Sequence, residues 1–475
     1  MNLNSVIVEI LVAALGLLVL VMSLVLPRAK KALIGYFSAF ALLCILVFTF
    51  VYNSGESISF FKGLYVSDNI STYFKQIFLI SAAMVSLMSI SYVKKLTDSR
   101  SEFFVIMIFA TLGMMVMASA NDLITLYIGL ELMSISFIIL TAYEKKSIKS
   151  TEAGTKYVLL SAMSTAILLY GMSLLYGLSG SVNFPDIISF LESGSNPSMV
   201  VLGSVLVIAG FGFKISAAPF HMWSPDIYEG APTPVTAFLA GGSKVAGFAV
   251  LIKILMQVMQ SNQSMVVVLV ITLSILSMVI GNIIAIPQTN LKRMLAYSGV
   301  AHAGYMLIGI VSYTTAGISA MLYYILLYIF ANIGAFASIT AFSNQTGKDD
   351  IQDFSGMWKR SPLLTAVLLT SLLSLAGIPP AAGFIGKFYL FTAAAEQGYL
   401  WIAFVAMGMS VVSIYYYIVV IRVMLMGEAS DTSKIKIPAS LKLVMIVSVI
   451  MILVMGLYPG PITNWTTLVG NTFIK

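Results

Sequence analysis

Titratable side chains stand deep inside long apolar stretches of this chain. Glu131 lies about nine residues into one apolar run, and Lys244, His302 and Lys387 lie well inside others. A helical rise of about 1.5 Å per residue puts these side chains near the middle of a bilayer. Ionisable groups are costly there and mark ion or proton pathways by default. A glutamate, two lysines and a histidine at one depth therefore predict a proton relay.

The segment 210–240 adds two more candidates, Lys214 and His221, in the sequence GFGFKISAAPFHMWSPDIYEGAPTPVTAFLA. Its prolines interrupt an apolar helix, and broken backbone persists at membrane depth only when it is buried in protein or lines a wet cavity. Structural roles compete with the relay. Lys214 and Lys387 could satisfy carbonyls freed by helix breaks, His221 could cap the broken helix, and His302 could be a neutral packing histidine.

A pair between Glu131 and Lys214 would control a proton. A carboxylate about 4 Å from an ammonium changes the energy by about 4 kcal/mol at an effective dielectric of 20. Forming and breaking the pair would load and discharge the lysine, and Lys244, His302 and Lys387 would extend the relay. Sequence gives depth but not direction around the helix, so Lys156 remains an alternative partner for Glu131.

Other charged residues have membrane-surface interpretations. Lys156 stands only a few residues into its apolar run, so its side chain could reach the surface. Lys253 follows Lys244 by nine residues, which favours the same snorkelling interpretation. Glu9, Glu396 and Arg422 are close enough to the ends of apolar runs to contact lipid headgroups.

The composition indicates a polytopic membrane protein. Hydrophobic residues make up 59% of the chain and charged residues 9%, against about 25% charged in a soluble domain. The single cysteine, Cys44, excludes cysteine-ligated iron–sulfur and zinc sites and internal disulfides. The net charge of +7 indicates no nucleic-acid partner, because the basic residues stand in short clusters between apolar runs.

Apolar windows of about 20 residues predict an all-α protein with about fourteen transmembrane spans. The first run is long enough to span, and its basic residues follow it, so it is not a cleavable signal. The seventh and twelfth spans are overlong and broken, and the longest gaps, 51–73 and 179–197, are predicted as loops. The predicted spans are 5–26, 32–52, 74–93, 102–120, 122–143, 153–178, 198–228, 234–258, 264–286, 290–312, 315–342, 361–396, 399–426 and 439–459.

Basic residues alternate between the loops, which supports this count. The positive-inside rule then predicts both termini on the outer side, and Lys62 and Lys75 are exceptions in otherwise bare loops. The loop with Asp226 and Glu229 should also be inside. The basic loops contain Arg28, Lys30 and Lys31; Lys94, Lys95 and Arg100; Lys145, Lys146 and Lys149; Lys292 and Arg293; Lys348, Lys359 and Arg360; and Lys434 and Lys436.

The two broken spans suggest an internal repeat. Spans 4–8 and 9–13 each contain five helices with the fourth one broken, and an odd number inverts the second set. Inverted repeats with interrupted helices are typical of transporters with a midplane ion site. We therefore expect an N-terminal three-helix segment (1–101), repeat 1 (102–260), repeat 2 (261–427) and a C-terminal helix (428–475).

Several segments resemble the subunit N family of respiratory complex I, the proton-translocating NADH:quinone oxidoreductase, which includes mitochondrial NADH dehydrogenase subunit 2. The match runs from about span 4 to span 13. The segments are TLYIGLELMSISFIILTAY, EAGTKYVLLSAMSTAILLYG, GFGFKISAAPFHMWSPDIYEGAPTPVTAFLAGGSKVAGF, NLKRMLAYSGVAHAGYMLIG and SLLSLAGIPPAAGFIGKFYLF.

The resemblance implies an antiporter-like fold with a proton channel made of two half-channels. It maps the key glutamate to Glu131, a second lysine to Lys156, the central lysines to Lys214 and Lys244, and the exit lysine to Lys387. His221 and His302 fall in matching motifs. For Lys156 the resemblance outweighs the surface interpretation that depth alone favours.

The expected function is proton translocation in a bacterial or archaeal cytoplasmic membrane, driven by quinone reduction in partner subunits. The partners would be other membrane-arm subunits, including further antiporter-like ones, together with lipid. No flavin motif, dinucleotide fingerprint or cluster ligand is present in the sequence, so quinone, flavin and iron–sulfur clusters are expected in partner subunits and no cofactor or metal in this chain. The alternatives are a subunit of a multisubunit cation/proton antiporter and a non-pumping scaffold.

Overall fold

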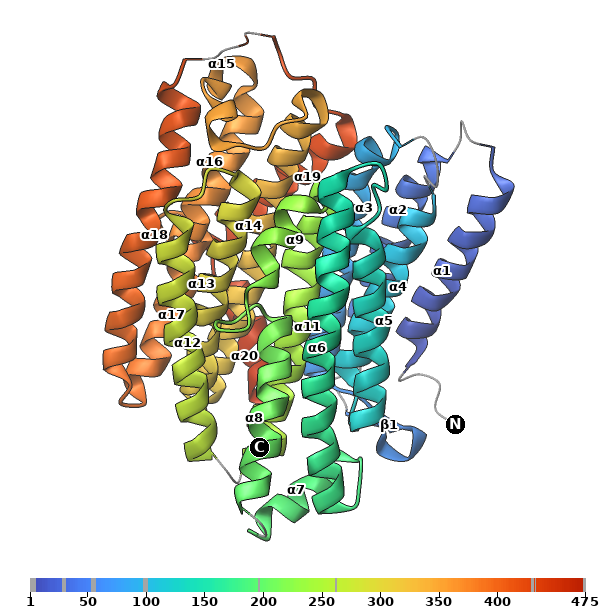
Figure 1. The fold of residues 1–475 in the computed structure, drawn as a ribbon, viewed down its shortest axis with the longest axis vertical. Coiled ribbons are helices and arrows are strands. Elements are labelled where there is room, and N and C mark those ends of the chain that lie inside the picture. The colour runs from blue at the N-terminus through green and yellow to red at the C-terminus, as the bar shows by residue number, and fades with distance from the viewer. Residues whose placement is uncertain are drawn as a thin grey trace.

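The computed structural model describes residues 6–27, 31–52, 57–96, 101–194, 197–260, 263–428, 431 and 433–472. Arg28, Lys30 and Arg100, which contribute to the predicted basic loops, lie outside these ranges. The described chain forms a bundle of helices that run roughly along the long axis of the molecule (Figure 1). The prediction of an all-α membrane protein is confirmed.

Thirteen helical segments among the described residues are long and apolar enough to cross a membrane. They are α1 (Ile7–Val25), α2 (Ala32–Tyr52), α3 (Asn69–Val93), α4 (Glu102–Ser119), α5 (Leu123–Thr141), α6 (Ile148–Ser179), α8 (Pro197–Lys214), the continuous segment Thr233–Val258, α12 (Gln263–Ala285), α13 (Leu291–Val311), α14 (Thr315–Thr346), α18 (Leu400–Met426) and α19 (Ala439–Leu457).

The twelfth predicted span, 361–396, is present as two halves. Helices α16 (Pro362–Ala376) and α17 (Ala382–Glu396) have 15 residues each, so neither is long enough to cross alone. The seventh span is also broken, because α8 is followed by eight non-helical residues and then by α9 (Trp223–Gly230). Both breaks occur where the sequence predicts them, and each contains a cis peptide bond before a proline, at Pro219 and at Pro380.

Side chains satisfy the backbone groups that the seventh-span break exposes. The indole of Trp223 donates to the Phe213 carbonyl at 2.8 Å, and the Ala218 amide donates to the Ser277 hydroxyl at 2.9 Å. Unsatisfied backbone groups at this depth would cost several kcal/mol each. The break is therefore a built feature of the fold.

The segment Thr233–Val258 changes its helical pitch twice. It consists of α10 (Thr233–Phe238), the π-helical turn η4 (Leu239–Ser243), α11 (Lys244–Lys253) and a second π-helical turn, η5 (Ile254–Val258). Lys244 follows the first π-turn directly. Such turns occur mostly inside α-helices and frequently at functional sites.

Three spans form the buried centre of the bundle. Every residue in the most apolar windows of Thr233–Val258, α13 and α14 is buried, whereas two-thirds of the corresponding window in α1 is not. Helices α12 and α13 approach closely because Gly281 packs against the α13 backbone, where an added Cβ would lie 2.5 Å from the Ala301 nitrogen. The candidate relay residues on these central helices are thereby held on rigid elements.

Short elements occupy the connections and distinguish the two ends of the molecule. The predicted loops 51–73 and 179–197 instead contain a hairpin and an amphipathic helix, and the helix α20 after α19 was not predicted. Helices α15 and α7 lie at opposite ends (Figure 1). These elements are β1 (Ile58–Phe60), η3 (Phe61–Gly63), β2 (Tyr65–Ser67), α7 (Phe184–Glu192), η7 (Ile351–Phe354), α15 (Met357–Arg360) and α20 (Gly460–Asn471).

The basic connections gather at the α15 end. A cleft of about 670 Å³ there is lined by residues in or next to the connections after α3, α5, α9, α12 and α14. They include Lys95 and Lys348 in connections and Lys149 and Lys292 in the first turns of α6 and α13. Glu229 also lines this cleft, in agreement with its predicted position among the basic loops. Convergence of these connections on one end agrees with the predicted alternation of the spans.

Candidate functional site

Glu131 and Lys214 belong to one polar cluster formed by α5, α6 and α8, in which Lys214 is buried and Glu131 is partly exposed. The Lys214 ammonium donates to the hydroxyls of Ser134 on α5 at 2.8 Å and Ser161 on α6 at 3.1 Å. The Thr165 hydroxyl donates to the Glu131 carboxylate at 3.2 Å. Lys214 is 2% exposed, so its charge depends on these partners.

The hydroxyls of this cluster, from Ser134, Ser161 and Thr165, recur at helical spacing, and we call this row the hydroxyl ladder. Ser134 follows Glu131 by three residues on α5, and Thr165 follows Ser161 by four residues on α6, so each pair shares a helix face. Lys214 bonds to Ser134 and Ser161 at one level of the ladder, and Glu131 bonds to Thr165 at the next level. The direct pair between Glu131 and Lys214 is absent from this structure, and the two groups are instead one helical turn apart with hydroxyls between them. Hydroxyls both donate and accept hydrogen bonds, so they can pass a proton.

Lys244 occupies the centre of the bundle. Its ammonium donates to the Gly299 carbonyl of α13 at 2.7 Å and to the Tyr328 hydroxyl of α14 at 3.4 Å. One turn further along α11, Gly247 packs against the end of α8, where an added Cβ would lie 3.4 Å from the Lys214 Cβ. The helix that carries Lys244 therefore touches the residue at the start of the seventh-span break.

His302 connects three helices through two tyrosines. Its Nδ1 lies 2.7 Å from the Tyr324 hydroxyl of α14, and its Nε2 lies 3.2 Å from the Tyr417 hydroxyl of α18. Tyr417 is also 2.5 Å from the Ser298 hydroxyl. Both ring nitrogens thus have a hydroxyl partner, so the imidazole can receive a proton on one side and release one on the other.

Lys387 lies beyond His302 and also caps the broken twelfth span. Its ammonium donates to the Ala376 carbonyl, at the end of α16, at 2.9 Å and to the Ser410 hydroxyl of α18 at 2.8 Å. It stands over the Tyr305 ring at 4.9 Å. Gly299, His302 and Tyr305 occupy successive turns of α13, so this helix arranges Lys244, His302 and Lys387 in order.

Lys156 lies apart from the buried clusters, in a network of charges near the α15 end. Its ammonium is 2.8 Å from both Glu152 and Asp226, and its side chain is 42% exposed. Asp226 also accepts from Arg293, and Glu229 pairs with Arg293 and Lys149. The network joins α6, α9 and α13. The surface position estimated from depth describes this lysine, and its role in proton transfer stays a prediction.

His221 lies in the break between α8 and α9. It is 5% exposed, and its ring centroid lies 6.2 Å from that of Tyr297 on α13. The structure brings His221 to the junction between the seventh span and the central helices. It does not join His221 to the ladder around Lys214.

Two surface interpretations from the sequence are wrong. Lys253 is buried and donates to the carbonyls of Ala118 and Ala120 at the end of α4, at 3.1 and 3.0 Å. Glu9 forms a buried ion pair with Lys75 at 2.9 Å, so Lys75 is inside α3 and not in a loop. A lysine near a helix end can reach carbonyls as readily as headgroups, and sequence cannot distinguish the two.

Sequence reasoning missed the uncharged members of both clusters. The hydroxyls of Ser134, Ser161 and Thr165 and the tyrosines of α14 and α18 contact the predicted titratable groups. Only helical spacing in the sequence could have indicated these residues, because Ser134 and Glu131 are three residues apart and Tyr324 and Tyr328 are four apart. That signal is weak, because serine and tyrosine are frequent throughout the apolar runs.

Comparison with known sequences identifies the family. A sequence profile described as "NADH:quinone oxidoreductase/Mrp antiporter, TM" matches residues 120–414, which contain every candidate site residue. The chain belongs to this family. Relatives that cover the whole chain include the NADH-quinone oxidoreductase subunit N of Moorella thermoacetica, 47% identical over 99% of both chains. The subunit N of Heliobacterium modesticaldum is 48% identical over 99% of this chain and 100% of the relative.

Solved structures of other membrane complexes contain chains with the same fold. A chain of respiratory complex I from Thermus thermophilus with bound aureothin superposes with a TM-score of 0.81, at 29% identity over 96% of this chain and 98% of the other. A chain of the Mrp complex from a Dietzia species superposes with a TM-score of 0.87, at 19% identity over 100% and 98% of the two chains. The second similarity concerns the fold alone.

Proposed function

We propose that this chain is a proton-translocating membrane-arm subunit of a complex I-type NADH:quinone oxidoreductase. The observation that carries the proposal is a series of titratable groups that runs from the partly exposed Glu131 through the buried Lys214, Lys244 and His302 to Lys387, with a hydroxyl group bonded to each of them. Buried ionisable residues are expensive at a helix centre, by at least about 2.5 kcal/mol each on insertion scales. A scaffold that moves no protons would gain nothing that offsets this free-energy cost. The full-length relatives named subunit N support the same function.

The proton route follows the order of the contacts. Lys214 gains or loses a proton as the Glu131 carboxylate moves toward or away from it along the hydroxyl ladder. Lys244 receives the proton near the start of α11, and His302 with its tyrosines passes it toward Lys387. Lys156 serves at the charged mouth of the first half-channel, and His221 is a further candidate member at the seventh-span break.

The position of Glu131 indicates that a neighbouring subunit packs against α5. It is partly exposed, and helical spacing puts it in line with Ile128 and Ile135, which are 58% and 53% exposed. A carboxylate at mid-bilayer depth in an apolar exposed stripe is costly in lipid. Another membrane-arm subunit covers this face in the assembled complex, and it controls the environment of Glu131.

The chain itself supplies proton transfer and not redox chemistry. Quinone, flavin and iron–sulfur clusters belong to partner subunits in this proposal, which deliver energy by moving the charged partners of the relay. The two broken helices belong to two inverted repeats, 102–260 and 261–427, between the N-terminal segment 1–101 and the C-terminal segment 428–475. The protein resides in a bacterial or archaeal cytoplasmic membrane with both termini outside.

A cation/proton antiporter subunit is the rival within transport. The Mrp similarity at 19% identity concerns the fold, whereas subunit N relatives at 47–48% identity span the whole chain. The test reconstitutes the intact complex in liposomes and follows proton movement during quinone reduction. We expect proton translocation that depends on quinone reduction and persists without sodium. Sodium-dependent exchange without quinone reduction would instead support the antiporter.

A further inference from the structure

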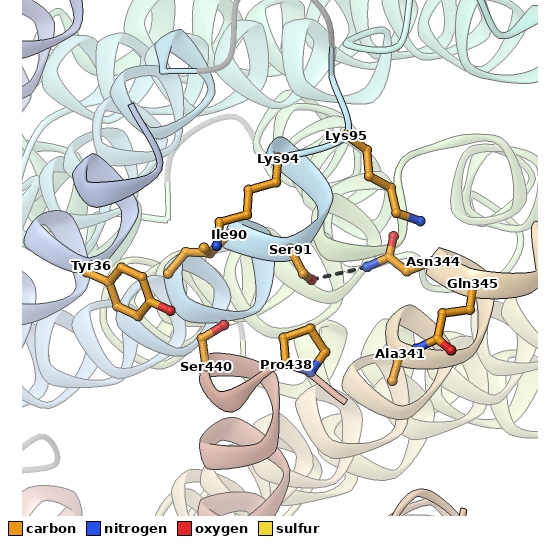
Figure 2. Close-up of a pocket in the computed structure, with 10 residues that line it drawn as sticks. All are labelled: Tyr36, Ile90, Ser91, Lys94, Lys95, Ala341, Asn344, Gln345, Pro438 and Ser440. Atoms are coloured by element: carbon orange, nitrogen blue, oxygen red, sulfur yellow. Dashed lines mark hydrogen bonds between the residues drawn. The ribbon is translucent and has the colours of Figure 1, made fainter. Parts of the chain in front are cut away.

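A small pocket opens at the α15 end between α2, α3, α14 and α19. It has a volume of about 210 Å³. Its charged lining residues are Lys94 and Lys95, just after the end of α3, and no acidic residue of the described chain lines it. Tyr36 of α2, Ser440 of α19 and the bonded pair Ser91 and Asn344 complete the polar wall (Figure 2). A pocket walled by lysines and neutral polar groups suits an anion.

The start of α19 adds to this preference. Pro438, its N-cap residue, and Ser440 in its first turn both line the pocket, and no side chain among the described residues caps the helix. The first amides of a helix lack intrahelical partners and attract anions, since the N-terminus carries a partial positive charge. Two lysines and a helix N-terminus therefore border one small volume, although the Lys94 and Lys95 ammonium groups point apart (Figure 2).

An apolar stripe leads from the pocket along α2. Tyr36, Phe40, Leu43, Val47 and Phe50 recur every three or four residues and share a face, and each is between 42% and 67% exposed. The fifteen residues from Tyr36 to Phe50 span about 21 Å, longer than the roughly 15 Å of one leaflet's hydrocarbon.

The far end of the stripe is closed by α20. The Phe50 ring lies 6.1 Å from that of Trp465, which in turn lies 4.7 Å from Tyr73 of α3. An anion site at the basic end of an exposed apolar stripe of this length matches one class of molecule. We propose that this pocket binds an anionic phospholipid, with its phosphate between Lys94, Lys95 and the start of α19 and an acyl chain along α2.

The basic end of the molecule is the side on which such lipids are abundant. The positive-inside rule assigns this end to the cytoplasmic side, where anionic lipids attract basic segments near the membrane surface. Lys95 also borders the neighbouring cleft that contains Glu144, so Lys94 is the lysine committed to this pocket. The lipid would fill the space between the N-terminal helices and α19 and fasten α2 to the central bundle.

The test places a photo-crosslinker on the stripe in the intact complex. Phe40→p-benzoylphenylalanine is reconstituted in nanodiscs of phosphatidylglycerol or phosphatidylcholine, and mass spectrometry of this chain measures the lipid adduct. We expect a phosphatidylglycerol adduct that falls about 30-fold in the double variant Lys94→Gln, Lys95→Gln, which corresponds to about 2 kcal/mol from two lysines. Lys94→Arg with Lys95→Arg should retain the adduct.

The matched control changes another adjacent pair of exposed lysines at the same end, Lys145→Gln and Lys146→Gln, and should leave the adduct intact. Equal adducts from phosphatidylcholine, or an adduct undiminished in the Lys94, Lys95 variant, would overturn the proposal. So would loss of the adduct on addition of excess inorganic phosphate, which indicates a free-anion site. An adduct to another protein chain would overturn it too, by showing that a subunit covers the stripe.

Discussion

Gly299 illustrates how a residue without a side chain controls a titratable one. A Cβ at this position would lie 2.8 Å from the Lys244 ammonium and 3.0 Å from the Tyr328 hydroxyl. The lysine reaches the Gly299 carbonyl only because that space is free. Its charge in the centre of the bundle is therefore stabilised by backbone, at a point where any larger residue would displace it.

Gly299→Ala should impair proton translocation while the complex still assembles. The added methyl group pushes Lys244 from its carbonyl partner, and hydrogen bonds to charged groups contribute about 1.5–3 kcal/mol. Since about 1.4 kcal/mol is a factor of ten, we expect a loss of about tenfold in the proton translocation rate of reconstituted complex. Gly408→Ala is the control, because no described atom lies within 4 Å of its added Cβ. Equal rates in both variants would refute the role of Gly299.

The depth of the charged residues could be predicted from the sequence, but their partners could not. Counting residues from the ends of apolar runs located Glu131, Lys244 and Lys387 at buried or partly buried positions. Whether Glu131 faced Lys214 depended on how α5, α6 and α8 are rotated, which is a tertiary property. The same count failed for Lys253 and Glu9, because it measures distance to the membrane surface and not to the nearest helix.

The two broken helices use their lysines differently. Lys387 donates to the carbonyl of Ala376 at the end of α16, so it stabilises the break in addition to its proposed role in the relay. The recorded partners of Lys214 are hydroxyls on two other helices, and tryptophan and serine side chains satisfy the backbone of its own break. The predicted structural role thus describes Lys387, whereas the partners of Lys214 are side-chain hydroxyls and not carbonyls freed by the break.

The charge network around Asp226 should restrain α9. Asp226→Asn removes the ion pairs to Lys156 and Arg293, and pairs of this exposed kind contribute about 1 kcal/mol together. Hydrogen exchange of the α9 amides should accelerate about fivefold. Asp186→Asn is the control, since this carboxylate is bonded to Ser181 and Asn183 and lies far from α9. Unchanged exchange in Asp226→Asn would mean that packing alone holds α9.

Elements that cross the membrane were predictable because hydropathy measures their length directly. The break in 361–396 followed from GIPPAAG, whose two prolines interrupt a helix. The amphipathic helices α7 and α20 escaped prediction, since segments of 9 and 12 residues fall below any membrane-spanning window. The hairpin β1–β2 has three-residue strands, which are too short for a periodic signal.

The whole molecule has a basic end and a nearly bare end, which should face opposite sides of the membrane. In a Cys44→Ser background, Lys145→Cys and Ser189→Cys put single thiols on exposed residues at the two ends. We expect a membrane-impermeant maleimide to label Lys145→Cys from the cytoplasmic side and Ser189→Cys from the outer side. Labelling of both from one side would require a different number of crossings.

The most direct test of proton transfer through this chain is the number of protons moved per quinone reduced by reconstituted complex that contains Lys214→Met. The substitution keeps the length of the side chain and removes its charge, and assembly is verified by co-purification of the other subunits. Lys62→Met, in the exposed turn between β1 and β2, is the control. We predict that Lys214→Met abolishes translocation through this chain and lowers the ratio, while Lys62→Met does not. An undiminished ratio in assembled Lys214→Met complex would contradict the account.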